Sequence, residues 1–292
     1  MIYKFEPIWV PKPWGGEYWL ISAVGDRLSV VAEGPEAGLT LLQLIERHGP
    51  ELLGDRVHAE TGGRFPLLLK IIDAREDLSV QVHPNDAAAG RLEGIGSRGK
   101  TEMWYAEHAD SGASLLSGLR PGVTRQQYLE AEGSDAIMDL LNRYEVHTDD
   151  VFFLPAGRIH AIGAGCRMVE IQQSSDITYR IYDYGRNREL HLEKAREAIT
   201  WPPRGDYRVP MDHSAKRTNL VVCNSFVVDR FILTTPATIQ GVNGSFSIIT
   251  MLSGEAEASG THLNAGESAL IGPGGFSIAP LSPKAIFLLT SA

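Results

Sequence analysis

The residues of this sequence best suited to chemistry are an amide, two imidazoles and a carboxylate that lie at the ends of predicted strands. The run Leu78–Asp86, LSVQVHPND, alternates like a β-strand, so Gln81 and His83 leave the same face of it. Pro84 cannot donate a backbone hydrogen bond to a sheet, and it ends this strand just after His83. A strand end therefore presents an amide and an imidazole side by side.

The carboxylate and the second imidazole come from two later segments. Glu102 lies in the β-prone run Thr101–Tyr105, which we expect to pair alongside the first strand. His160 follows a Pro-Ala-Gly turn after the apolar strand Val151–Leu154. Two imidazoles, one carboxylate and one amide oxygen suit a borderline divalent cation such as Zn²⁺. The expected ligands of one such ion are Gln81, His83, Glu102 and His160.

Composition describes an ordinary globular protein. The chain has 292 residues, of which 43% are hydrophobic and 22% charged, enough for one large domain or two smaller ones. Its formal net charge of −9 argues against a nucleic-acid or anionic-membrane partner. No apolar run approaches the ~20 residues that cross a bilayer, and the N-terminal segment lacks the core of a signal peptide. Cys166 and Cys223 offer no disulfide framework, so we expect a cytoplasmic protein.

Periodicity predicts a mainly β protein with a few short helices. Leu67–Ile72 and Leu78–Val82 are the best candidates for central strands. Thr40 is the expected N-cap of a helix that stops at Gly49-Pro50. Residues 122–145 have helical spacing in two stretches, 124–132 and 134–143, which predicts a small helical insert.

The C-terminal part of the chain reads as a second β domain. Gly, Ser and Pro turns there separate four strand-like runs, Phe226–Leu233, Phe246–Leu252, Ser268–Ile271 and Ala285–Leu289. Pro273–Ile278 echoes the Pro155–His160 turn, with Ile278 at the place of the ligand histidine. We therefore expect a metal-binding domain over residues 1–203 and a degenerate domain without metal over 204–292, with one metal ion per chain.

These motifs have a family resemblance. The ligand spacing is similar to the two cupin motifs, and further segments resemble the type I mannose-6-phosphate isomerases, most of all their short bacterial form. In chain order they are Trp14-Gly15-Gly16, Phe65–Lys70, Ser79–Asp86, Gly99–Glu102, Gln172–Asp176, Thr178–Arg180 and Arg188–His191. The resemblance implies two cupin-type β-sandwich (jelly-roll) barrels, the helical insert lying in the first. It also implies zinc dependence and interconversion of mannose 6-phosphate and fructose 6-phosphate, with a small sugar phosphate as partner.

The resemblance implies roles for residues beyond the ligands. It places Arg180 in the active site, where its permanent charge would stabilise an enediolate; the alternative is an ion pair with Glu170 or Asp183. It suggests that Ser79 and Lys100 contact the phosphate of the substrate.

Two assignments stay open at this point. Trp14 is either a wall that stacks on the sugar or a packing residue. The general base is a hydroxide held by the metal, Lys100 with a lowered pKa, or a nearby carboxylate, so Lys100 is also a catalytic candidate.

Two other functions compete with isomerisation. Without Gln81, the set His83, Glu102 and His160 is the 2-His-1-carboxylate pattern of non-haem iron oxygenases. Gln81 argues against that chemistry because it fills a position that dioxygen or a cosubstrate needs. A non-catalytic sugar-phosphate-binding cupin is the other alternative, and its expected signature is loss of Arg180 or of a ligand.

Overall fold

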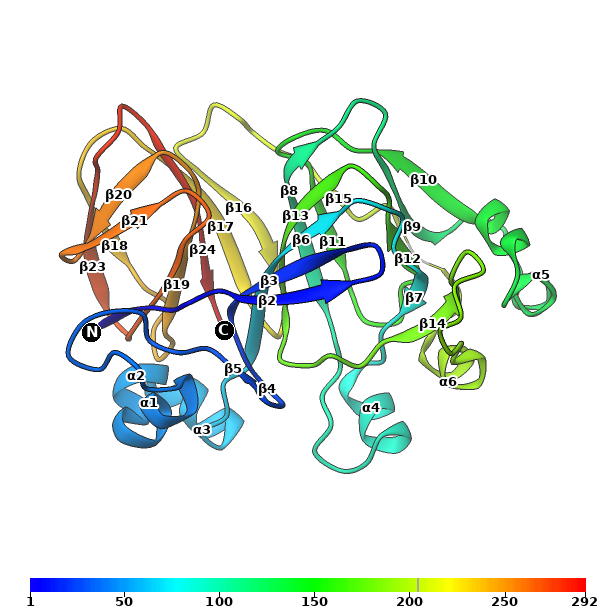
Figure 1. Cartoon of the computed structure of the whole chain (residues 1–292), viewed down its shortest axis with the longest axis horizontal. Coiled ribbons are helices and arrows are strands. Elements are labelled where there is room, and N and C mark those ends of the chain that lie inside the picture. Colours follow the sequence, from blue (N-terminus) through cyan, green and yellow to red (C-terminus); the bar gives the residue numbers. More distant parts are fainter. Residues whose placement is uncertain (204) are drawn as a thin grey trace. The chain divides into compact units, whose positions relative to one another are not determined.

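The structure is a computed structural model in which residues 1–203 and 205–292 are described. Most of its elements are β-strands, joined by turns and a few short helices (Figure 1). The predicted mainly β class is confirmed. Over the described ranges, no helix combines the length and the apolar character needed to span a membrane.

The residues group by their contacts into two compact units. The first unit comprises Met1–Ile8, Trp19–Leu69 and Pro210–Ala292, and the second comprises Trp9–Tyr18 and Lys70–Val209. The predicted division at residue 203 differs from this one, because residues 1–8 and 19–69 group with the C-terminal strands. One cause is β1 (Ile2–Lys4), which pairs with β22 (Ser268–Ile271). Residue 204, the first of the predicted C-terminal domain, lies outside the described residues.

Two sheets build the second unit. The seven-stranded sheet has the order β15-β11-β8-β13-β6-β3-β2, and the five-stranded sheet β10-β9-β12-β7-β14. The strands of the larger sheet are β2 (Ile8–Lys12), β3 (Gly15–Ile21), β6 (Leu67–Ala74), β8 (Glu102–Ala109), β11 (Val151–Leu154), β13 (Cys166–Gln173) and β15 (Arg208–Val209). Those of the smaller sheet are β7 (Val80–Val82), β9 (Ser114–Leu119), β10 (Leu141–Glu145), β12 (His160–Ile162) and β14 (Tyr179–Tyr182).

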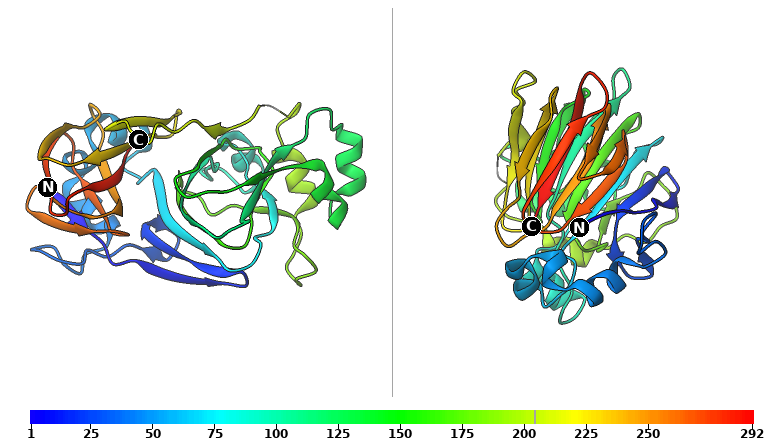
Figure 2. Two further views of the ribbon diagram at one scale, coloured as in Figure 1. Left: turned by 90° about the horizontal axis from the view of Figure 1, so that it is seen from above. Right: turned by 90° about the vertical axis from the view of Figure 1, so that its left-hand side faces the viewer.

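Both sheets of this unit contribute side chains to one apolar core. Trp104, Phe152 and Met168 come from the larger sheet, and Leu115 and Ile162 from the smaller one. Seen from above, the strands of the second unit curve around a common interior (Figure 2, left). The unit is therefore a β-sandwich whose two sheets face each other across that interior.

The strand of Glu102 lies opposite the strand of Gln81 and not beside it, so the predicted pairing of these two strands is wrong. β8 belongs to the larger sheet and β7 to the smaller one. β8 pairs with β11 on one side and β13 on the other, which leaves no edge for β7. β6 and β7 each have a neighbouring strand on both sides, as predicted for central strands.

The predicted helical insert is present, with one correction. Its helices are α5 (Arg125–Ala131) and the 3₁₀ helix η1 (Asp135–Leu140), and further helices of this unit are α4 (Asp86–Leu92) and α6 (Leu192–Ala198). The second predicted helix, 134–143, ends at Leu140 because Leu141 is buried and starts β10, which pairs with β9. Pairing with a neighbouring strand here overrides helical spacing.

The first unit is also a two-sheet sandwich. Its sheets have the orders β1-β22-β19-β24-β17-β16 and β18-β23-β20-β21. The strands not yet located are β16 (Arg217–Val222), β17 (Val227–Leu233), β18 (Ala237–Gln240), β19 (Ser247–Ser253), β20 (Glu255–Ala258), β21 (Thr261–Asn264), β23 (Gly275–Pro280) and β24 (Ala285–Ser291). Ile278 is only 1% exposed in the shared core, beside residues such as Ile249 and Phe276.

Three short helices and a small hairpin complete the first unit. They are α1 (Leu41–His48), α2 (Pro50–Leu53), α3 (Asp55–Thr61) and the hairpin β4 (Ala23–Val24) with β5 (Arg27–Leu28). α1 starts where predicted: the Thr40 hydroxyl accepts from the Gln43 amide, and the Gln43 side chain accepts from the Thr40 amide. This reciprocal capping box satisfies two backbone donors that the helix leaves unpaired.

Candidate metal centre

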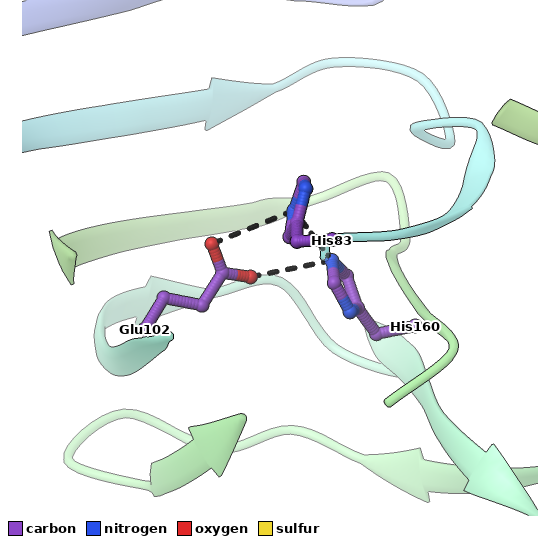
Figure 3. A group of neighbouring side chains, drawn as sticks. All are labelled: His83, Glu102 and His160. Atoms are coloured by element: carbon purple, nitrogen blue, oxygen red, sulfur yellow. Dashed lines mark hydrogen bonds and ion pairs between the residues drawn. The ribbon is translucent and has the colours of Figure 1, made fainter. Parts of the chain in front are cut away.

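Three of the four predicted ligands converge inside the second unit. Figure 3 shows both oxygens of Glu102 turned toward the rings of His83 and His160. The two Nε2 atoms are 3.2 Å apart, and Glu102 places Oε1 3.2 Å from His160 and Oε2 3.6 Å from His83. The three side chains are 1%, 0% and 2% exposed in chain order. Among residues 1–203 and 205–292, this is the one group of three or more His, Cys, Asp or Glu side chains whose ligand atoms converge in this way.

Strand register sets a row of functional side chains across the smaller sheet. His160 lies opposite Gln81, and Gln81 lies opposite Arg180, on the strands β12, β7 and β14. Directly opposed residues of antiparallel strands leave the same face of a sheet. His83 lies one residue beyond the end of β7, and Glu102 begins β8 in the facing sheet. The two sheets thus bring the ligands together from opposite sides.

Backbone contacts fix the tautomers of both rings. Nδ1 of His83 lies 2.8 Å from the carbonyl oxygen of Ile177, and Nδ1 of His160 lies 2.8 Å from that of Arg158. A carbonyl can only accept, so each Nδ1 carries the hydrogen and donates. Burial and the Lys100 ammonium lower the pKa of both imidazoles, that of His160 to about 3. Both rings are therefore neutral, and their Nε2 lone pairs face the same space.

The donor set fits a divalent cation. Oε1 of Glu102 is buried and accepts no hydrogen bond, a costly state for a carboxylate oxygen. Burial, with repulsion from Glu170, raises the pKa of Glu102 above its ordinary value. A cation between the two lone pairs and this oxygen would offset both costs. Two imidazole nitrogens and a carboxylate are ligands that zinc takes in proteins.

Gln81 lies beside these ligands. Its Oε1 accepts from the hydroxyl of Ser79 at 3.2 Å, and its Nε2 lies 3.5 Å from Nε2 of His160. A half-turn of the amide exchanges its oxygen and nitrogen, which would direct the oxygen to the ligand nitrogens. The role of Gln81 as a fourth ligand stays a prediction, as does contact of the buried Ser79 with phosphate.

Lys100 lies among the ligands themselves. Its Nζ donates to Oε2 of Glu102, lies 3.1 Å from Nε2 of His83, and lies 3.3 Å from Oε1 of Glu170. Trp14, in contrast, is buried in the apolar core with side chains such as Ile72. Its position favours the packing alternative over stacking on a sugar.

Arg180 forms no ion pair with Glu170 or Asp183, the predicted alternative to a place in the active site. The carboxylate of Asp183 binds Arg188, with Oδ1 and Nη2 2.6 Å apart, and that of Glu170 contacts two lysines. The guanidinium of Arg180 donates to the carbonyl oxygen of Glu189 at 3.2 Å and, in the described part of the chain, forms no ion pair with a carboxylate. The structure thus does not show the ion-pair alternative, and the place of Arg180 in catalysis stays a prediction.

Sequence reasoning missed the buried charges behind the site. Lys70 and Glu170 are both buried, and Nζ of Lys70 lies 3.0 Å from Oε1 of Glu170. Lys70 interrupts the otherwise apolar run Leu67–Ile72. A lone charge in a central strand was the signal that could have identified it.

Comparisons with known proteins show the family of this chain. A family described as "Phosphomannose isomerase type I, catalytic domain" matches residues 10–98. The mannose-6-phosphate isomerase ManA of Bacillus subtilis (strain 168) is 35% identical over 281 residues, which cover 86% of this chain and 85% of that protein. The chain belongs to the type I mannose-6-phosphate isomerase family.

Other members of the isomerase family support the assignment. The mannose-6-phosphate isomerase of Streptococcus mutans is 41% identical over 197 residues, covering 65% of this chain and 60% of that protein. The crystal structure of the mannose 6-phosphate isomerase from Bacillus subtilis matches with a TM-score of 0.85 at 29% identity, over 99% of both chains. The predicted pair of cupin-type barrels is thus the architecture of this family. The family is metal-dependent, and the His83, Glu102 and His160 site is present here.

Proposed function

We propose that the protein interconverts mannose 6-phosphate and fructose 6-phosphate with one Zn²⁺ per chain. His83, Glu102 and His160 would hold the ion, and Gln81 would complete the set. The observation that carries this proposal is the meeting of two neutral imidazoles with a buried carboxylate oxygen that lacks a hydrogen bond. Family membership supplies the substrate, and the chemistry of the donors supports the metal.

The reaction moves hydrogen between C1 and C2 of the sugar. A proton must leave a carbon beside a carbonyl, and negative charge then develops on the two oxygens of an enediolate. When bound, the metal supplies Lewis-acid polarisation of the sugar oxygens. Arg180, on the same face as Gln81, supplies a fixed positive charge for the developing negative charge.

Lys100 serves the reacting end of the sugar in this proposal. Its Nζ lies beside the metal ligands, between the carboxylates of Glu102 and Glu170. An ammonium at this place can donate to a sugar oxygen and can pass a proton between neighbouring oxygens. Contact of Lys100 with the phosphate, which is on C6, stays a prediction, as it does for Ser79.

The cellular setting follows from the substrate. A sugar phosphate is an intracellular metabolite, and Cys166 and Cys223 are both free thiols. Both facts fit a reducing cytoplasm.

A direct assay tests the function. The zinc-loaded protein is incubated with mannose 6-phosphate, and fructose 6-phosphate is measured, with unphosphorylated mannose as a comparison. We expect conversion of the phosphate ester and very little of the free sugar. His83→Ala should lose zinc and activity together, whereas the exposed His108→Ala should keep both. Zinc-loaded protein that forms no fructose 6-phosphate would refute the proposal.

A further inference from the structure

A row of buried charges of alternating sign leads through the second unit to the metal centre. Its members, each 6% exposed or less, are Glu17, Lys70, Glu170, Lys100 and Glu102. Nζ of Lys70 lies 3.5 Å from Oε1 of Glu17 and 3.0 Å from Oε1 of Glu170. The first three side chains come from β3, β6 and β13, and Glu102 from β8, strands that are neighbours in the sheet order. The row therefore crosses the sheet from strand to strand.

A gain in folding stability does not by itself explain this row of buried charges. Replacing a buried ion pair by apolar side chains of similar volume is often neutral or stabilising. Burial opposes the charge on Lys70, but Glu17 and Glu170 outweigh it and raise the pKa of the ammonium. A permanent charge in the otherwise apolar run Leu67–Ile72 indicates a role at the site to which the row leads.

Glu170 forms ion pairs through one oxygen and accepts a hydrogen bond at the other. Lys70 contacts Oε1, and the indole N–H of Trp104 donates to Oε2 at 2.7 Å. Trp104 is opposite Glu170 in the pairing of β8 with β13, so the backbone register fixes this donor. The same Oε1 lies 3.3 Å from Nζ of Lys100. Glu170 is thus the link between Lys70 and Lys100.

Among the residues that the structure describes, Glu170 is also the one carboxylate paired with Lys100 that is not a proposed metal ligand. The other partners of Lys100 are Nε2 of His83 and Oε2 of Glu102, on two of the proposed ligands. A nitrogen lone pair given to a metal cannot also accept from an ammonium. With the metal on Nε2 of His83 and Oε1 of Glu102, the partners left to Lys100 are Oε2 of Glu102 and Oε1 of Glu170, and only Glu170 of these two is not itself a ligand.

We propose that Lys70 is a positioning residue for the isomerisation. Together with Trp104 it fixes Glu170, and Glu170 then holds Lys100 at the reacting end of the sugar. This inference rests on the proposed function and adds a residue to it.

The test compares Lys70→Met with Lys70→Arg in the zinc-loaded enzyme, measuring kcat, KM and zinc content. We expect Lys70→Met to lower kcat about 10- to 100-fold, as for other groups that orient an active-site side chain, with a much smaller change in KM. It should keep one zinc per chain, and Lys70→Arg, which retains the charge, should recover most of kcat. Ile71→Val, a buried change at the next position of β6, is the matched control and should leave kcat near wild type.

A double-mutant cycle separates positioning from a structural role. If Lys70 acts through Glu170, Lys70→Met should cost little more in a Glu170→Gln background. Additive losses, loss of zinc from Lys70→Met, or wild-type kcat in Lys70→Met would each overturn the inference while leaving the proposed function intact. If Lys70→Met does not fold, Lys70→Gln takes its place, and failure of both to fold would make the lysine structural. An inactive zinc-loaded wild type would instead overturn the proposed function, and the role of Lys70 with it.

Discussion

The protonation state and orientation of the ligand side chains depend on the groups that surround them. His83 and His160 are neutral and oriented because backbone carbonyls take their Nδ1 hydrogens and because burial disfavours their charged forms. Both imidazoles were identifiable in the sequence by their spacing. Lys70 could have been noticed as a lone charge in an apolar run, but its pairing with Glu170 was not predictable, because a partner 100 positions away leaves no local pattern.

The role proposed for Arg180 predicts a selective loss of turnover. Arg180→Lys keeps the charge but loses the planar fork, so an interaction made mainly in the transition state is weakened. We expect kcat to fall about 10²–10³-fold, or roughly 3–4 kcal/mol, with a smaller change in KM. Zinc content and melting temperature should stay near wild type. Arg167→Lys, at an arginine paired with Glu107, is the control; unchanged kcat in Arg180→Lys would exclude Arg180 from catalysis.

A cluster in the first unit predicts how stability depends on pH. Hydrogen bonds from Tyr3 and His48 lower the pKa of Glu36 from 4.5 to about 2. A carboxyl with a lowered pKa in the folded state stabilises above its unfolded pKa, and this contribution is lost as pH falls from about 4.5 toward 2.

Glu36→Gln should therefore lower the melting temperature at pH 7 and flatten its fall over that acid range. Glu60→Gln, at an exposed carboxylate paired with Arg56, is the control. Parallel melting curves of wild type and Glu36→Gln from pH 7 to pH 2 would contradict the assignment.

Elements with local signals were predictable, and elements defined by a distant partner were not. The capping box at Thr40 encodes the start of α1 within four residues. The stretch 134–143 has helical spacing, yet its last residues begin β10, because they pair with the edge of β9. The strand of Glu102 was expected beside that of Gln81, and no local pattern shows that β11 and β13 occupy both of its edges. The ligands were predictable by type, but the facing sheets that join them were not.

The turn before β12, at Gly157, allows a test of how one structural element supports the metal site. Gly157 has a φ of +87°, and a Cβ there would lie 2.2 Å from Oγ1 of Thr200. Its amide also donates to the carbonyl of His83 at 2.8 Å, and His160 follows the turn three residues later. The turn therefore supports both His83 and His160.

Gly157→Ala should lower stability by about 1–3 kcal/mol and weaken zinc binding. Gly122→Ala is the matched control, with a φ of +85° and no atom within 4 Å of the added Cβ. It bears the backbone strain without the clash. Equal melting temperatures and zinc affinities for the two variants would show that the turn does not act on the ligands.

At the scale of the molecule, two sandwiches of the same kind differ in what fills them. The second unit has an N₂O ligand set inside, whereas the first unit has apolar side chains such as Ile278 in its core. The sequence predicted two β domains from turn spacing and the repeated Pro-x-Gly turn. It did not predict that residues 1–8 join the C-terminal strands, since the pairing of β1 with β22 spans almost the whole chain.

The most direct test is a titration of activity with metal. The protein is stripped with a chelator, zinc is added back in steps, and conversion of mannose 6-phosphate is measured with the zinc bound per chain. Activity should be absent in the stripped protein and rise in proportion to bound zinc. It should reach its plateau at one ion per chain, and His83→Ala should neither bind zinc tightly nor convert the substrate. Full activity in metal-free protein, or a plateau at two ions with one retained by His83→Ala, would contradict a single catalytic metal at His83, Glu102 and His160.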